Sequence, residues 1–336
     1  MNRRKFNAAG LATLLATVPR WAVAEPAASD QYGYQVAAIN SGLLTMHHNG
    51  MANSQNPIDD RTLFQVASCS KTATALAVLT LVRDGRVDLD VPVNRYLGHW
   101  QLPGPRGDVA TIAELMSHTA GTTVSGFAGY GPDEALPTVR DILAGRGPAN
   151  SDPVRAQRRI LGRFRYSGGG TMVLQSLIEE VTGSDFATYT TNEVLKPIGA
   201  SRATFAITPA RPHAHGSYEN GQALDGGFRR HPESAAAGLW ATAADLANLF
   251  HAVLQALAGA RHAIIPQVLA ERMVTPVSQG AGLGVFVSSG GIVSHEGRNH
   301  GFDSFVVAER STGRVRAAVT NRNGAIEHHA RRFLPD

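Results

Sequence analysis

Four neighbouring residues in the stretch FQVASCSKTATALAVL, residues 64–79, have side chains that could do chemistry: Ser68, Cys69, Ser70 and Lys71. The Ala- and Leu-rich segment that follows predicts a helix from about residue 68 to residue 84. Because Ser68 and Lys71 are three positions apart, their side chains would share one face of that helix and could touch. Cys69 and Ser70 would point to other sides of the helix.

A serine at the first turn of a helix is well placed to become a nucleophile. The unpaired N–H groups and the helix dipole stabilise a forming alkoxide there. A partly desolvated lysine one turn later can hold a lowered pKa and act as the base. The same residues also suit a plain N-cap serine and a solvated lysine, so this motif alone leaves both interpretations open. Cys69 is expected to be a small buried residue, because nothing near it in sequence would favour a thiolate.

Lysine is rare in this chain, at only Lys5, Lys71 and Lys196, whereas arginine is abundant. Arginine does not give up its proton in proteins, but a desolvated lysine can. The choice of lysine at position 71 therefore indicates a site where a proton is exchanged. Lys196 precedes Pro197 in a turn-like segment and has no such context.

The first 24 residues predict an export signal rather than part of the fold. A basic start, MNRRKF, precedes a short apolar run at 8–18 and the small-x-small cleavage site that ends at Ala24. The pair Arg3-Arg4 resembles a twin-arginine signal. The apolar run is too short to span a membrane. We therefore expect a mature protein that begins near residue 25 and is periplasmic or secreted.

Composition excludes several other classes of protein. The net charge is +4, and four cations lie before residue 25, so the mature chain is near neutral and we expect no nucleic-acid partner. The single cysteine rules out an intrachain disulfide. The histidines lack metal-ligand spacing, and we expect neither a metal nor another cofactor. No later stretch is long and apolar enough for a stable membrane span.

Predicted strands lie near both chain ends and predicted helices lie mainly between them. The strands are expected at 34–39, 43–48, 283–287, 291–295, 304–309 and 314–320. The helices are expected, besides 68–84, at about 111–121, 138–144, 172–181, 184–200, 240–257 and 325–334. This order predicts an α+β fold, with an antiparallel sheet built from both ends, helices against it and an inserted, mostly helical region. We expect one domain, 25–336, with a sheet subdomain at about 25–90 and 220–336 and a helical subdomain at about 91–219.

Six motifs stand in an order that resembles a known superfamily. They are TLFQVASCSKT, GRVDLDVPVNRYL, LMSHTAG, FRYSGGG, AAAGLWATAADLANL and SHEGRNHGF, and the resemblance extends from about residue 34 to residue 321. The superfamily is that of the serine β-lactamases and penicillin-binding proteins, above all its branch of class C β-lactamases, D-alanyl-D-alanine carboxypeptidases and related esterases. The resemblance implies a β-lactamase-like fold with the active site between the two subdomains.

The resemblance also implies a role for each catalytic residue. Ser68 would be the acylated nucleophile and Lys71 the base beside it, and Tyr166 would relay protons as phenolate or as donor. His295 would supply a donor or a positive charge. The backbone N–H groups of Ser68 and Arg298 would bind the oxyanion. Which of Lys71 and Tyr166 is the base at each step stays open.

Three further positions would contact substrate, and two of them depart from the superfamily pattern. Gly297 would let the substrate approach the strand edge. Gly168 stands where the tyrosine motif usually ends in Asn, which argues against strong β-lactam turnover. Glu296 replaces a small hydroxyl residue and could repel a substrate carboxylate. His295 in place of lysine resembles the carboxypeptidase branch.

The sequence thus predicts an exported serine hydrolase that acts through an acyl-enzyme on Ser68. Its partner would be a small-molecule or peptide substrate, a cell-wall peptide with D-amino acids or a β-lactam, cleaved at the amide bond. A carboxylesterase of the same fold is the first alternative, with an ester as substrate. A non-catalytic penicillin-binding sensor or binding protein is the alternative of another class.

Overall fold

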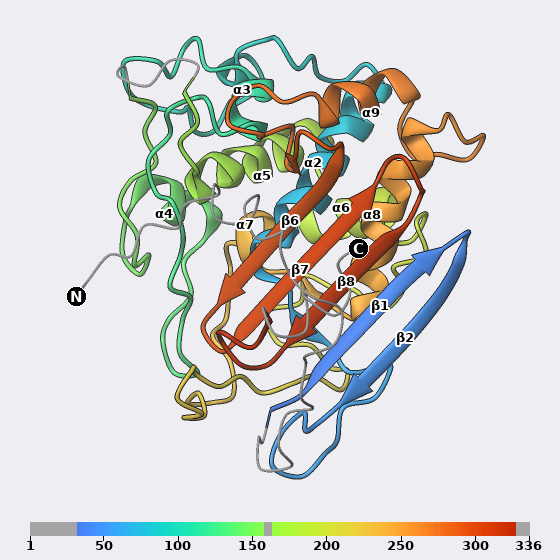
Figure 1. The fold of residues 1–336 in the computed structure, drawn as a ribbon. Helices are drawn as coiled ribbons and strands as arrows, with labels where there is room; N and C mark the ends of the chain where they lie inside the picture. Colours follow the sequence, from blue (N-terminus) through green and yellow to red (C-terminus); the bar gives the residue numbers. More distant parts are fainter. Residues whose placement is uncertain (1–31, 158–162, 327–336) are drawn as a thin grey trace.

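The computed structural model describes residues 32–157 and 163–326, and its centre is a six-stranded antiparallel sheet (Figure 1). The strand order is β2-β1-β8-β7-β6-β5. The strands are β1 (Tyr34–Asn40), β2 (Leu43–Asn49), β5 (Phe286–Val287), β6 (Ile292–Asn299), β7 (Phe302–Glu309) and β8 (Val315–Thr320). Strand β1 pairs with β8, so the two ends of the chain form one sheet, and the predicted α+β fold is confirmed.

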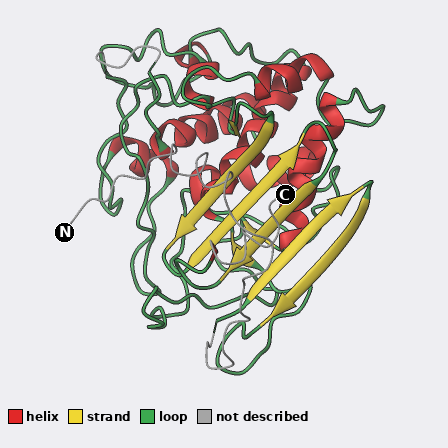
Figure 2. Cartoon of the chain, in the orientation of Figure 1, coloured by secondary structure: helices red, strands yellow, loops and turns green. Residues whose placement is uncertain are grey.

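Figure 2 shows the helices gathered behind and above the strands. Helix α8 (Ala243–Leu257) packs against β1, β7 and β8. A capping box between Thr242 and Asp245 starts α8, and the apolar side of the helix faces the sheet. Helix α2 (Ser70–Arg83) is buried on all sides except at its C-terminal end, and the short 3₁₀ turn η1 (Ala67–Cys69) precedes it. Helix α2 lies in the interior, where it packs against α5 and α7, and its buried threonine hydroxyls are hydrogen-bonded.

Most of the remaining elements are short, and the exception is α5 with 15 residues. They are β3 (Phe64–Gln65), η2 (Val93–Arg95), α3 (Ile112–Met116), α4 (Val139–Ala144), α5 (Gly168–Thr182), α6 (Phe186–Thr190), η4 (Thr191–Leu195), α7 (Ser234–Ala237), β4 (Trp240–Ala241) and α9 (Gln267–Val274). Strands β3 and β4 form a separate two-stranded sheet.

Several predicted boundaries were wrong; side-chain capping explains one of them and a left-handed backbone explains another. Helix α5 begins at Gly168 and not at residue 172, because the Ser167 hydroxyl caps it by accepting from the Gly170 N–H. Helix α3 ends at Met116 and not at Gly121, because His118 adopts a left-handed backbone, with φ +59°. Strand β6 continues to residue 299, so the predicted motif at 295–297 lies inside the strand and not at its end.

Two of the predicted segments cannot be compared with the structure. The export signal at 1–24 lies outside the described residues, and so does nearly all of the helix predicted at 325–334. Within residues 32–157 and 163–326, no helix has the length and apolar character needed to cross a membrane. The same residues contain no group of three or more His, Cys, Asp or Glu side chains arranged to hold a metal ion.

Candidate active site

A sharp backbone turn presents Ser68 at the start of α2. Ala67, the residue before it, has φ +48°, a left-handed conformation that is costly for a residue with a Cβ. The N–H of Cys69 donates to the Val66 carbonyl and closes the turn at 3.1 Å. Of the three candidate nucleophiles, Ser68 alone is partly exposed, whereas Cys69 and Ser70 are buried.

Ser70 ties the turn to a neighbouring segment. Its hydroxyl donates to the Ala67 carbonyl at 2.5 Å and accepts from the Leu239 N–H at 3.0 Å. Both hydrogen-bonding functions of this buried hydroxyl are therefore used by the backbone. Ser70 holds the strained turn in place and has no proton left for a reaction.

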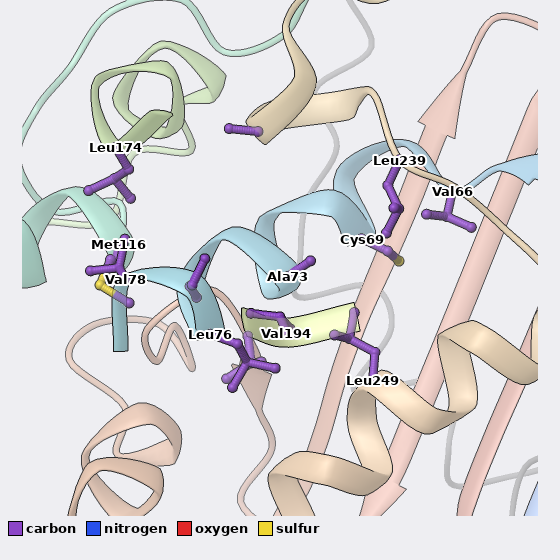
Figure 3. Close-up of a cluster of buried hydrophobic side chains, with 14 of the residues drawn as sticks. Val66, Cys69, Ala73, Leu76, Val78, Met116, Leu174, Val194, Leu239 and Leu249 are labelled. Carbon is purple, nitrogen blue, oxygen red and sulfur yellow. The ribbon is translucent and has the colours of Figure 1, made fainter. Parts of the chain in front are cut away.

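Cys69 belongs to the hydrophobic core, as expected from the sequence. Figure 3 shows its side chain among Val66 and Leu239, beside α2. Its Sγ lies 3.3 Å from the Ser304 hydroxyl, and burial raises the pKa of the Cys69 thiol to about 12. The group therefore stays a thiol near neutral pH, and a thiol is a poor nucleophile.

Lys71 reaches Ser68 as the spacing of the two residues predicted. Its Nζ lies 3.2 Å from the Ser68 Oγ and 2.8 Å from the Ala236 carbonyl oxygen. The side chain is buried, and burial lowers the pKa of the Lys71 amine to about 7. In the neutral amine, one N–H bonds the Ala236 carbonyl while the lone pair can point at the Ser68 hydroxyl.

The carbonyl that orients Lys71 comes from α7, an element that sequence analysis missed. Two buried side chains fix this single turn of helix. Thr74 of α2 donates its hydroxyl proton to the Ala235 carbonyl at 2.9 Å, and the Ala235 N–H donates to the Gln175 Oε1 of α5 at 3.0 Å. The alanine run allows α7 to approach both helices closely. Its sequence, SAAA, is too short to carry a helical period, so only the run of small residues signals it.

Tyr166 completes the group. The Lys71 Nζ lies 4.9 Å from the centroid of the Tyr166 ring. Burial raises the pKa of the Tyr166 phenol above its usual value, although a hydrogen bond with the Ser68 side chain acts in the opposite direction. The phenol is therefore protonated at neutral pH while the Lys71 amine is close to half deprotonated. Ser68, Lys71 and Tyr166, which come from two motifs far apart in the sequence, lie together.

His295 on β6 is buried and differs from the donor or positive charge that the resemblance implied. Its Nδ1 lies 2.7 Å from the Glu296 carbonyl oxygen, which can only accept, so Nδ1 carries the ring proton. Burial lowers the pKa of His295 to about 3, and the nearby Lys71 charge adds to this effect. The ring is therefore neutral, and its Nε2 presents a lone pair that has no hydrogen-bond partner among the described residues.

The predicted oxyanion and substrate positions lie partly in this site. A Cβ on Gly297 would come within 2.9 Å of the Ser68 backbone nitrogen, so β6 passes directly beside that N–H. Glu296 is half-buried, and its negative charge helps to raise the pKa of Tyr166. The Arg298 side chain pairs with Asp303 at 2.8 and 3.1 Å. The backbone N–H pair of Ser68 and Arg298 stays a prediction.

Gly168 is placed differently from the other predicted substrate residues. It is buried at the N-terminus of α5, and its N–H donates to the Ser125 carbonyl at 3.2 Å. A Cβ at this position would lie 3.0 Å from the Phe127 ring. Glycine is needed here because the loop packs on the helix start, and this packing leaves little room for a substrate contact.

Solved structures share the fold. The octameric penicillin-binding protein homologue from Pyrococcus abyssi has a TM-score of 0.73 at 23% identity, over 90% of this chain and 73% of that one. A D-stereospecific amidohydrolase from Streptomyces sp. has a TM-score of 0.72 at 21% identity, over 90% and 93%. A D-amino acid amidase from Ochrobactrum anthropi, solved with L-phenylalanine amide, has a TM-score of 0.72 at 20% identity, over 90% and 92%.

The curated sequence relatives match over only part of their length. The Bacillus subtilis protein PbpX is 28% identical over 180 residues, which is 52% of this chain and 42% of PbpX. The protein flp of Staphylococcus aureus is 27% identical over 157 residues, 44% of this chain and 29% of flp. The chain thus matches less than half the length of these curated relatives. The family model described as Beta-lactamase matches residues 19–334, nearly the whole chain, and the protein therefore belongs to the beta-lactamase family.

Proposed function

We propose that the protein is an exported serine hydrolase that cleaves amide bonds of D-amino-acid derivatives through an acyl-enzyme on Ser68. One observation carries this proposal: the Lys71 Nζ lies 3.2 Å from the Ser68 Oγ, in a setting that lowers the pKa of the amine to about 7. A lysine of that pKa is poised as a general base near neutral pH.

Acylation then follows from the geometry. The Lys71 amine takes the hydroxyl proton of Ser68 while the oxygen attacks the carbonyl carbon of the substrate. The C–N bond breaks, the Tyr166 phenol gives its proton to the leaving nitrogen, and the Lys71 ammonium returns a proton to Tyr166. The raised pKa of Tyr166 keeps the phenol protonated, so near neutral pH Lys71 is the one of the two groups that is available as a base.

Deacylation returns the enzyme to its starting state. A water molecule gives a proton to Lys71 and attacks the acyl carbon, the ester bond breaks, and Ser68 regains its proton. The N–H groups of Ser68 and Arg298 would bind the oxyanion in both halves, since β6 passes beside the Ser68 N–H.

The groups around the nucleophile favour an acyl donor that carries an N–H or an ammonium group. The Nε2 lone pair of buried His295 has no donor among the described residues, and the negative charge of Glu296 acts on the neighbouring Tyr166 phenol. A free substrate carboxylate would find no donor in the His295 ring and would be repelled by the negative charge of Glu296, which disfavours peptides that end in D-alanyl-D-alanine. D-amino-acid amides supply donors instead, and two proteins with the same fold are named for activity on D-amino acid amides or as D-stereospecific amidohydrolases.

Four substrates offered to the purified enzyme test this assignment. We expect the fastest turnover on a D-alanine 4-nitroanilide, slower turnover on a peptide ending in D-alanyl-D-alanine, and little on a chromogenic cephalosporin. Turnover confined to a short-chain 4-nitrophenyl ester would support the carboxylesterase alternative. An absence of turnover and of covalent labelling by a fluorophosphonate would contradict the proposal and favour a binding protein. Loss of residues 1–24 from protein recovered outside the cytoplasm would support export.

The pH dependence of kcat/KM tests the role of Lys71. The amine must be neutral to accept a proton, so activity is expected to rise as the pH increases through about 7. The pKa of His295 is lowered to about 3 and the pKa of Tyr166 is raised. Neither group therefore adds a second change in kcat/KM between about pH 5 and pH 9. A profile that is flat or falls across this range, with full recovery on return to pH 8, would contradict Lys71 as the base.

The Gly297→Ala variant tests the approach of β6 to the nucleophile. Its Cβ would lie 2.9 Å from the Ser68 nitrogen and 2.5 Å from the Ser304 Oγ, so the strand or the turn must shift. We expect the rate of fluorophosphonate labelling to fall about 10²-fold, because displacement of an oxyanion donor has effects of this size. Gly290→Ala is the control, since only the Ser288 Oγ, at 3.7 Å, lies near that position. Equal labelling rates in both variants would show that β6 has no part in the reaction.

A further inference from the structure

His118 contacts each residue of the four-residue segment 164–167, which carries Tyr166. Its backbone carbonyl accepts from the Arg165 N–H at 2.8 Å, and its ring Nδ1 accepts from the Ser167 N–H at 3.2 Å. Its ring lies against the Tyr166 ring, with centroids 4.5 Å apart and planes tilted by 39°. The His118 and Phe164 rings are perpendicular, with their centroids 5.9 Å apart.

The conformation of His118 shows that this contact is costly to build. The residue is buried and has φ +59°, a left-handed backbone at the end of the turn that follows α3. This conformation turns the carbonyl and the ring of His118 toward the same four-residue segment. Strain of this kind persists where the surrounding structure requires it, often at functional sites.

The hydrogen bond from Ser167 also fixes the state of the ring. Since Nδ1 accepts a hydrogen bond from the Ser167 amide, it carries no proton, so the ring is neutral and its proton is on Nε2. Burial, and after it the nearby Lys71 charge, hold the pKa of His118 well below its usual value, which agrees with this neutral state. A neutral ring can lie against Tyr166 without adding a second cation beside Lys71.

We propose that His118 is a positioning residue that holds the Tyr166 phenol in the place from which it protonates the leaving group. This inference rests on the proposed function, because it assigns the support of a proton donor that the function requires. His118 itself does not touch the reacting atoms. It acts through the acceptor on the Ser167 N–H and through the face of the ring against Tyr166.

The predicted signature is a loss that depends on the leaving group. A 4-nitroanilide leaves as an amine and needs a proton, whereas 4-nitrophenolate leaves without one. In His118→Ala we expect kcat/KM on D-alanine 4-nitroanilide to fall about 10²-fold, as for a misplaced catalytic group, and on the matched 4-nitrophenyl ester less than about fivefold. His118→Asn keeps an acceptor at the position of Nδ1 and tolerates the left-handed backbone, so it should recover much of the loss.

Each rate is divided by the concentration of active sites, which is titrated with the fluorophosphonate on a separate sample, so that unfolded protein does not lower the value. His118→Phe keeps an aromatic ring but lacks the acceptor for the Ser167 N–H. If His118→Ala does not fold, the same anilide and ester rates are compared between His118→Phe and His118→Asn. The double variant His118→Phe/Tyr166→Phe should be no slower on the anilide than Tyr166→Phe alone, because both changes disable one function. Additive losses, or equal losses on anilide and ester, would overturn the positioning role. A wild-type protein that is not labelled would instead overturn the proposed function and this inference with it.

Discussion

The Ser68→Ala variant is expected to lose all covalent labelling by a fluorophosphonate, and to lose turnover by about 10⁴-fold or more, as when other serine nucleophiles are removed. The alkoxide of Ser68 is the only atom in the proposed mechanism that bonds to the substrate carbon. Neighbouring groups cannot replace it, because the Cys69 thiol is buried with its pKa raised to about 12. The Ser70 hydroxyl is held between the Ala67 carbonyl and the Leu239 N–H. Intact mass after exposure to the probe checks the result.

Cys69→Ala is the matched control for this variant. It removes one sulfur from the core and leaves Ser68 and Lys71 in place, so labelling should continue at close to the wild-type rate. The free energy of unfolding should fall by about 1 kcal/mol, since a small buried side chain is shortened. If the Ser68→Ala protein still acquires the probe mass, or the Cys69→Ala protein does not, the nucleophile is a residue other than Ser68. Either outcome would contradict the mechanism.

The contact between Ser68 and Lys71 could be predicted because their relation is local. Ser68 and Lys71 are one helical turn apart, and a helix fixes such a distance whatever surrounds it. Tyr166 and His295 needed the resemblance as well, since only the fold brings distant segments together. The scarcity of lysine gave independent support, and the burial of Lys71 agrees with it.

The supporting groups could not be predicted, because they act through the backbone. Ala236 holds Lys71 by its carbonyl, and any residue at this position would offer the same oxygen. His118 stood in a motif that sequence analysis quoted without assigning it a role. Its function depends on a left-handed backbone that histidine seldom adopts and that the sequence does not announce.

The ring state of His295 depends on a contact of the same kind. A histidine in this motif was expected to provide a donor or a positive charge. The Glu296 carbonyl takes the Nδ1 proton, and burial keeps the ring neutral, so the site offers a lone pair instead. The sequence does not show which nitrogen of His295 carries the proton, and the proposed preference for substrates that carry an N–H group depends on that detail.

The Lys71→Arg variant is expected to lose about 10³-fold in kcat/KM, a loss typical of a missing general base. Arginine keeps the positive charge and a long side chain, but it does not release its proton at any pH at which the protein is folded. If Lys71 served only as a fixed cation, arginine would replace it with a modest loss. Lys71→Ala should be similarly inactive, and an added small primary amine should restore part of its activity by supplying the missing base.

Lys196→Arg is the matched control, because Lys196 is exposed and its amine donates to the neighbouring Asn192 side chain at 2.8 Å. This variant should be as active as the wild type. The pH profile adds a second criterion, since residual activity of Lys71→Ala should no longer rise through pH 7, where the Lys71 amine titrates. Full turnover in Lys71→Arg, or an unchanged acid limb in Lys71→Ala, would show that the proton of Ser68 goes elsewhere. The arrangement of Ala236 behind the amine would then have a structural purpose only, and Tyr166 would be the remaining candidate for the base.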